Sequence, residues 1–134
     1  MSQENVEALR RFAESLTPGD YEAYLELFHP EAEARDLAHL PDMPEMLRGR
    51  AAIAAVFEKW MEQLDDWEVD VSDYVDAEPW VVCALHWRAT GKGSGVPIEW
   101  RLADAYDLRD GKIVRAIFGF PDIPTALEAL ESTD

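Results

Sequence analysis

The sequence predicts an α+β fold in which helices pack on one face of a curved antiparallel sheet. Up to about residue 64, apolar residues recur mainly at the three- and four-residue spacing of helices. From residue 67 to residue 120 they alternate with polar residues instead, which is typical of strands. Helices that precede a run of strands indicate an α+β domain. A sheet lined by helices leaves an open end that can become a pocket.

Two helices are expected in the first 30 residues. Residues 2–16 carry an apolar stripe at helical spacing, with charged residues opposite. The segment "TPGD" ends this helix, and Asp20 is placed to cap a second, shorter one. His29 and Pro30 are expected to end that helix near Phe28, because a proline disfavours helical backbone in the residue before it.

The middle of the chain contains the clearest helix. Residues 31–37 are a strand candidate, and residues 38–47, which hold two prolines, are expected to form a loop. Residues 50–64 then place five apolar side chains on one helical face: Ile53, Val56, Phe57, Trp60 and Leu64. Truncation of Trp60 to alanine is expected to cost about 3–5 kcal/mol, the usual value for a large buried aromatic side chain.

Four strands and a closing helix follow. The strands are expected at residues 67–75, 79–91, 97–109 and 112–120, with turns at "GKGSG" and "RDG" between the later ones. Residues 122–132 form the last helix, where Asp122 can cap the first turn and Pro124 stands near its start.

Length and composition bound the possible partners. The 134 residues suit one domain, and 48% of them are hydrophobic. The net charge of −16 repels phosphate backbones and anionic membrane surfaces. We find neither an apolar run of about 20 residues nor a signal-like N-terminus, so a cytoplasmic location is expected. The single cysteine, Cys83, is expected to be a small core residue.

One carboxylate interrupts an apolar row in residues 97–109. Asp104 stands in the row made by Trp100, Leu102, Tyr106 and Leu108. In an apolar cavity its charged form would be disfavoured and its pKa would rise. It could instead pair with Arg101 or Arg115, or sit at a bulge, because structural ion pairs also perturb carboxylates.

The order of these elements resembles that of the NTF2-like superfamily. The residues that carry the resemblance are "RRFAESLTPGDYEAYLELFHPEAEARD", "LRGRAAIAAVFEKW" and "YDLRDGKIVRAIFGF". Within the superfamily the chain is similar to the SnoaL-like proteins and the ketosteroid isomerases, over nearly its whole length. The resemblance implies one domain over residues 1–134, with a cone-shaped curved sheet wrapped around the N-terminal helices. The same fold serves isomerases, cyclases, dehydratases, hydrolases and non-catalytic binders.

The resemblance to ketosteroid isomerases also implies roles for two acids. The aspartate that serves as base at the end of the first strand matches Asp36, with Leu37 where that family has proline. The second acid, before the "GK" turn, matches Asp104. Asp36 would then move a proton next to a carbonyl, and protonated Asp104 would hydrogen-bond the enolate, which is the known division of roles in that isomerase. The tyrosine of the first helix is replaced by Phe12.

Two other readings of these residues stay open. Asp36 can be a turn residue before the 38–47 segment, since aspartate is common in turns. The whole chain can be a non-catalytic ligand-binding or dimerisation domain of the same fold. Two related chemistries fit less well. SnoaL-type cyclases and limonene epoxide hydrolases have an acid on the last strand, where this chain has the apolar Ile117 and Phe118.

A small apolar molecule that carries a carbonyl group is the expected partner. Large side chains and a covering loop would suit a flat ligand, although aromatic residues also dominate ordinary cores. The candidate ligand-binding residues are Phe12, Tyr24, Phe28, His39, Met46, Trp60, Trp100, Phe118 and Phe120. No cofactor is expected, and the three histidines lack the spacing of metal ligands.

A homodimer is also expected. Trp80, Val82 and Ala84 alternate onto the outer face of the sheet beside His86 and Arg88. This partly apolar strip would be exposed in a monomer, and exposed apolar patches often mark interfaces.

Overall fold

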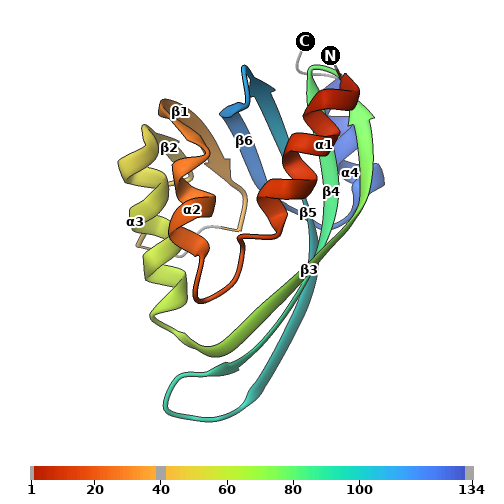
Figure 1. The fold of residues 1–134 in the computed structure, drawn as a ribbon. Coiled ribbons are helices and arrows are strands. Elements are labelled where there is room, and N and C mark those ends of the chain that lie inside the picture. The colour runs from red at the N-terminus through yellow and green to blue at the C-terminus, as the bar shows by residue number, and fades with distance from the viewer. Residues whose placement is uncertain (1, 39–41, 132–134) are drawn as a thin grey trace.

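A six-stranded, strongly curved sheet forms the body of the protein. The computed structural model describes residues 2–38 and 42–131. Figure 1 shows the sheet bending around the helices of the N-terminal half, with the C-terminal helix behind it. The helices are α1 (Ser2–Ala13), α2 (Tyr21–Glu26), α3 (Arg50–Met61) and α4 (Ile123–Glu131). The strands are β1 (Phe28–Asp36), β2 (Met46–Arg48), β3 (Leu64–Ala77), β4 (Trp80–Gly91), β5 (Pro97–Arg109) and β6 (Lys112–Phe120).

The strand order is β2-β1-β6-β5-β4-β3, and the sheet does not close. Strands β3 to β6 form the antiparallel run that the alternating pattern predicts. Strand β1 joins β6 in parallel, and β2 lies antiparallel to β1 at the edge. The predicted α+β class with a curved, cone-like sheet is therefore confirmed. Among the described residues, no helix is long and apolar enough to cross a membrane.

The second helix ends earlier than the sequence predicts. It stops at Glu26, and β1 begins at Phe28, so that His29 and Pro30 lie inside a strand. The reason is a tertiary contact. The Ile113 N–H of β6 donates a hydrogen bond at 2.9 Å to the carbonyl of Leu27, the residue just before Phe28. The β1–β6 register shifts between residues 28 and 33, and proline is tolerated at such irregularities because it has no N–H to offer.

A short strand replaces part of the predicted loop. Residues 46–48 form β2, which is too short to show a period in the sequence. Exposed ion pairs at its two ends connect it to β1. Arg48 Nη1 lies 3.0 Å from Glu33 Oε2, and Arg35 pairs with Glu45.

A bulge in β6 lies opposite Asp104. Ala103 pairs with Phe120 and Ala105 pairs with Ile117, so Asp104 alone faces two residues of β6. One of these is Gly119, whose φ of 94° is a conformation that favours glycine.

Helix α4 covers the outer face of the sheet and separates a second, smaller core from the main one. This outer core contains Trp80, Val82, Phe120, Ala126 and Leu130. Trp80 and Val82 are therefore buried within the chain, which corrects the prediction that they form an exposed strip. The sequence does not indicate which face α4 covers. Cys83 is buried in the main core, on the concave side.

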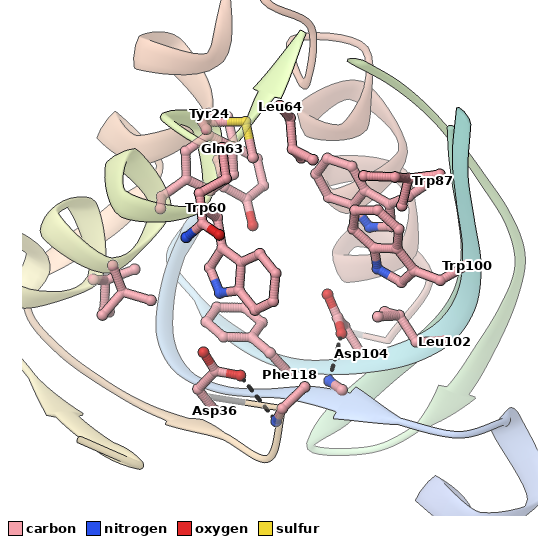
Figure 2. Close-up of a pocket in the computed structure, with 17 residues that line it drawn as sticks. Tyr24, Asp36, Trp60, Gln63, Leu64, Trp87, Trp100, Leu102, Asp104 and Phe118 are labelled. Carbon is pink, nitrogen blue, oxygen red and sulfur yellow. Dashed lines mark hydrogen bonds between the residues drawn. The ribbon is translucent and has the colours of Figure 1, made fainter. Parts of the chain in front are cut away.

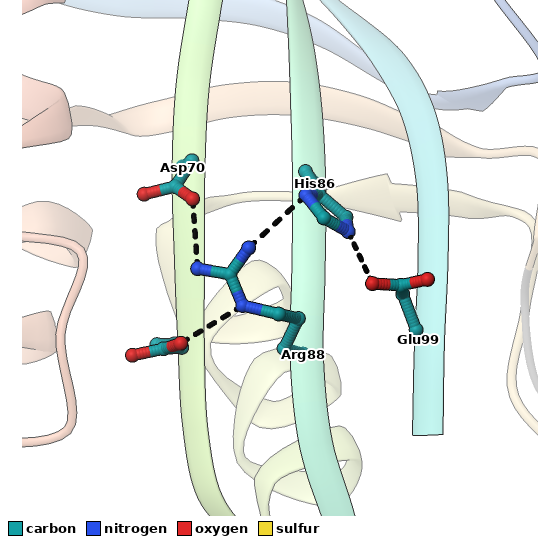
Figure 3. A network of polar contacts seen from close by, with 5 residues as sticks. Asp70, His86, Arg88 and Glu99 are labelled. Carbon is teal, nitrogen blue, oxygen red and sulfur yellow. Dashed lines mark hydrogen bonds and ion pairs between the residues drawn. The ribbon is translucent and has the colours of Figure 1, made fainter. Parts of the chain in front are cut away.

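The outer face beyond α4 is polar. The guanidinium of Arg88 on β4 lies 2.8 Å from both Glu68 and Asp70 of β3. Figure 3 shows Arg88 beside Asp70 and His86. The guanidinium also contacts His86, which lies 2.8 Å from Glu99 of β5. His86 thus lies on the outer face, as its alternation with Leu85 and Trp87 predicts.

Candidate active site: two carboxyl groups in an aromatic pocket

A cavity of about 400 Å³ opens between α3 and the concave face of the sheet (Figure 2). Its volume lies within the usual range for small-molecule sites. The lining is mostly apolar and includes Tyr24, Asp36, Ile53, Val56, Phe57, Trp60, Met61, Gln63, Leu64, Trp87, Ile98, Trp100, Leu102, Asp104 and Phe118. Alternate residues of β5 point to this wall, which is why the strand presents Trp100, Leu102 and Asp104 together.

The structure brings six of the candidate residues to this cavity. They are Tyr24, Asp36, Trp60, Trp100, Asp104 and Phe118. Phe12 and Phe28 lie in the core behind the lining, where their ring centroids are 4.5 and 5.5 Å from that of Tyr24. These two residues support the pocket wall without lining the cavity.

Three candidate residues are not placed in the cavity wall. Phe120 points to the opposite face and packs under α4, because the bulge at Gly119 changes the alternation of β6. Met46 is 45% exposed on the edge strand β2 and does not line the cavity. His39 lies outside the described residues.

Several lining residues were not among the candidates. Phe57 and Trp87 follow the inward-facing patterns of α3 and β4, so the sequence did contain a signal for them. Gln63 had no such signal, because it is a polar residue just after a helix end. It contributes an amide to an otherwise apolar part of the wall.

Asp104 is held by two hydrogen bonds at the base of the cavity. The Gly119 N–H donates to its Oδ1 at 3.0 Å, and the Tyr106 hydroxyl donates to its Oδ2 at 3.1 Å. The side chain is only 5% exposed. Arg115, a partner considered from the sequence, pairs instead with Asp107 on the outer side of the sheet, 2.7 Å away.

Burial raises the pKa of the Asp104 carboxyl to about 7. The hydrogen bonds from Gly119 and Tyr106 oppose this increase, because they favour the charged form. The charge of Asp36 adds to the increase. Asp104 therefore exchanges its proton near neutral pH, where a group of this pKa can serve as an acid or a base.

Asp36 ends β1 at the same cavity. Its backbone N–H donates to the Glu45 carbonyl at 2.7 Å, and its Oδ1 accepts a hydrogen bond from the Ala38 N–H at 3.1 Å. The turn interaction considered from the sequence is thus present, and the carboxyl also lines the pocket. Parallel pairing with β6 aligns Asp36 with Phe118, next to the bulge that holds Asp104.

Tryptophan side chains form the apolar walls. The rings of Trp87 and Trp100 stack at 5.7 Å with an interplanar angle of 6°. Trp60 of α3 approaches Trp100 at 6.4 Å. The cavity wall therefore presents aromatic surfaces.

Among the residues that the structure describes, the lining contains carboxyl groups but no cationic side chain. Within residues 2–38 and 42–131 there is also no group of three metal-binding side chains.

Comparison with known proteins identifies similar chains. The family model for the SnoaL-like domain matches residues 9–116. No curated protein sequence matches this chain.

Solved structures with the same fold are similar over most of the chain. An NTF2-like protein from Burkholderia thailandensis is 22% identical, with a TM-score of 0.72 over 96% of this chain and 97% of its own. TerC, co-crystallised with polyporic acid, is 19% identical, with a TM-score of 0.70 over 96% and 98%. A Catenulispora acidiphila protein with a ketosteroid isomerase-like fold, in complex with trimethylamine, is 18% identical, with a TM-score of 0.69 over 83% and 82%.

Proposed function

The chain belongs to the SnoaL-like domain family, and from this premise we propose that its pocket binds a small, flat, hydrophobic molecule and moves a proton next to a carbonyl group of that molecule. The observation that carries the proposal is the presence of two carboxyl groups, Asp36 and Asp104, in one mostly apolar cavity. Their different surroundings allow one to act as a base and the other as an acid.

The shape and charge of the pocket support a flat and uncharged ligand. The aromatic walls offer stacking surfaces, and the described part of the lining has carboxyl groups but no cationic side chain, which disfavours carboxylates and phosphates. Two structural neighbours were crystallised with small molecules, TerC with polyporic acid and the Catenulispora protein with trimethylamine.

In the proposed reaction Asp36 is the base. It takes a proton from the carbon next to the carbonyl, and the electrons of the broken C–H bond move onto the carbonyl oxygen. Asp104, with its pKa of about 7, is the acid that stabilises the resulting enolate. The reaction needs no cofactor, since the proton can return to another carbon of the same molecule.

Proton exchange of a model ketone tests this proposal. In deuterated buffer, wild-type protein should speed the exchange of the α-protons of 2-tetralone, followed by NMR. Asp36→Asn should slow this exchange by about 10²- to 10⁴-fold, the usual contribution of a positioned base. Asp70→Asn, on the outer face, is the matched control and should have no effect.

A second candidate function is binding without catalysis. Phe12 favours it, because it leaves the first helix without the hydroxyl that the isomerases have at this position. The two functions differ in outcome. Aromatic ketones that raise the melting temperature in a thermal-shift screen, but whose α-protons exchange no faster than in buffer, would identify a binding protein.

A further inference from the structure

Two tyrosine hydroxyl groups connect Asp104 to helix α2. The Tyr106 hydroxyl is 3.1 Å from Asp104 Oδ2, and the Tyr24 hydroxyl is 3.5 Å from that of Tyr106. Tyr24 and Asp104 both line the cavity, and they come from different walls (Figure 2). All three side chains are buried, so bulk water does not compete for these hydrogen bonds.

Aromatic packing holds the two tyrosine rings in place. Phe12 contacts both, with centroids 4.5 Å from Tyr24 and 5.7 Å from Tyr106. Phe28 packs against Tyr24, and Phe118 packs against Tyr106. Because close-packed rings cannot swing away, the hydroxyl groups stay next to each other.

The bulge at Gly119 decides which oxygen of Asp104 carries the proton. The Gly119 N–H can only donate, so Oδ1 must act as an acceptor in both ionisation states. A proton bound to Asp104 therefore sits on Oδ2, where it faces the Tyr106 hydroxyl. When this hydrogen is donated to Tyr106, Asp104 itself has none left to offer a ligand.

We call the three hydrogen-bonded side chains Asp104, Tyr106 and Tyr24 the tyrosine row. The ionisation state of Asp104 sets the direction of both hydrogen bonds in this row, because each hydroxyl has only one hydrogen. When Asp104 is ionised, Tyr106 donates to Oδ2 and Tyr24 donates to Tyr106. When Asp104 is protonated, Oδ2–H donates to Tyr106, Tyr106 donates to Tyr24, and the Tyr24 hydrogen becomes free. Either tyrosine oxygen can be the donor in their 3.5 Å contact.

We propose that Tyr24 contacts the oxygen of the ligand and that its hydroxyl donates a hydrogen bond to the ligand only when Asp104 is protonated. Tyr106 is the positioning residue that links Tyr24 to Asp104. The inference rests on the proposed function, because it assigns the donor for the carbonyl oxygen in that pocket. Tyr24 would also supply the hydroxyl group that the first helix lacks because it has Phe12.

Full proton transfer along the row balances. One proton passes from Tyr24 to the enolate oxygen, the Tyr106 proton moves to Tyr24, and the Asp104 proton moves to Tyr106. The enolate becomes an enol, and Asp104 becomes a carboxylate. The 3.5 Å contact is longer than a usual hydroxyl hydrogen bond, and we expect it to shorten when a ligand binds, as often happens in binding sites.

The other groups around Asp104 determine which variants are needed. Asp36 of β1 raises the pKa of Asp104, so Asp36→Asn should lower that pKa and keep the row intact. Burial raises the pKa of Cys83 on β4 well above its usual range, and it also raises the pKa of Tyr74 on β3, so both groups stay neutral near pH 7. Helices α1 and α3 contribute apolar side chains such as Phe12 and Trp60 here.

A first experiment needs no ligand. The pKa of the Asp104 carboxyl is measured by carbon-13 NMR in the wild type, Tyr106→Phe, Tyr24→Phe and Tyr21→Phe. Tyr106→Phe should raise it, because a hydrogen bond to the carboxylate is lost. Tyr24→Phe should raise it by a smaller amount, because Tyr106 loses its donor. Tyr21→Phe, on the same helix but packed against Phe57, is the control and should not change it.

A second experiment uses two probes of similar shape. 2-Acetylnaphthalene can only accept a hydrogen bond, whereas 2-naphthol can donate one. Tryptophan fluorescence gives their dissociation constants at about pH 5.5 and about pH 8.5, on either side of the Asp104 pKa of about 7. The ketone should bind about threefold to tenfold more tightly at the lower pH, and the naphthol should not share this preference. Both tyrosine-to-phenylalanine variants should lose the preference.

The outcomes separate this inference from the proposed function. If Tyr24→Phe leaves the pKa of Asp104 unchanged, Tyr24 is not coupled to Asp104 and the inference is wrong. The inference is also wrong if Tyr106→Phe still binds the ketone with the full pH preference. Failure of both probes to bind the wild type would contradict the proposed function. The NMR titration would still show whether the two tyrosines are coupled to Asp104. If circular dichroism shows that Tyr106→Phe is unfolded, the Asp104 pKa and the ketone binding of Tyr24→Phe alone test the inference.

Discussion

Asp104 and Asp107 are two buried aspartates on the same strand with opposite surroundings. Asp104 faces the cavity and accepts hydrogen bonds from uncharged donors. Asp107 faces outward, is 1% exposed, and accepts hydrogen bonds from Arg115 and Arg109. A buried carboxyl without a cation favours its neutral form, whereas the carboxylate of Asp107 has two arginine partners. The two residues should therefore respond differently to substitution.

Asp104→Asn should be neutral or stabilising at about pH 8 and least favourable near pH 4. The folded pKa of about 7 is higher than the unfolded value of about 3.9, so the stability that Asp104 contributes is fully present below pH 4 and is lost as the pH rises to 7. The difference between the free energies of unfolding of the two proteins should change by on the order of 4 kcal/mol over this interval. Urea denaturation across the pH range measures it.

Asp107→Asn is the matched control for that series. It should destabilise the protein by about 1–3 kcal/mol at pH 7, because two arginines lose a charged acceptor. A clear loss of stability at pH 7 for Asp104→Asn as well would contradict a raised pKa for Asp104.

At the scale of single elements, the bulge of β6 fixes the position of Asp104. Gly119→Ala should destabilise the protein by about 1–3 kcal/mol, because φ is 94° there and an added Cβ would lie 3.1 Å from that of Ala38. Gly93→Ala is the control, since Gly93 also has positive φ but its Cβ would meet nothing within 4 Å. Equal losses in urea denaturation would show that the contact with Ala38 has no effect.

Helix α3 lines the pocket with Ile53, Val56 and Trp60, of which Ile53 and Val56 also belong to the buried core. Because Trp60 is only partly buried, Trp60→Ala should cost less than the 3–5 kcal/mol that the sequence pattern predicts, about 1–2 kcal/mol. It should also weaken binding of 2-acetylnaphthalene. Ile53→Ala, at a buried position of the same helix, should cost about 2–5 kcal/mol. A larger loss for Trp60→Ala than for Ile53→Ala would contradict this assignment.

At the scale of the whole molecule, the homodimer stays a prediction. Helix α4 covers Trp80 and Val82, so the outer face that is left for a partner is the polar part around His86 and Arg88. Light scattering at micromolar concentration should give twice the mass of the 15.2 kDa chain. A monomer mass would contradict the prediction.

The sequence by itself determined most of the elements and the inward face of the clearest ones. Helical spacing identified α1 and α3, and alternation identified β3 to β6. It also placed Asp104 in the inward row of β5, because the side-chain period of a strand is two and needs no knowledge of the partner strands. Such local patterns indicate the buried face of an element but not which other element covers it.

Only the tertiary structure decided the contacts between distant parts of the chain. The parallel pairing of β1 with β6 shortened the second helix, and α4 buried Trp80 on the outer face. The contact between Tyr24 and Tyr106 joins residues 82 positions apart, so no local period could indicate it. Whether an aromatic residue lines a cavity or fills a core depends on the volume left between packed elements, which is fixed only when the whole chain has folded.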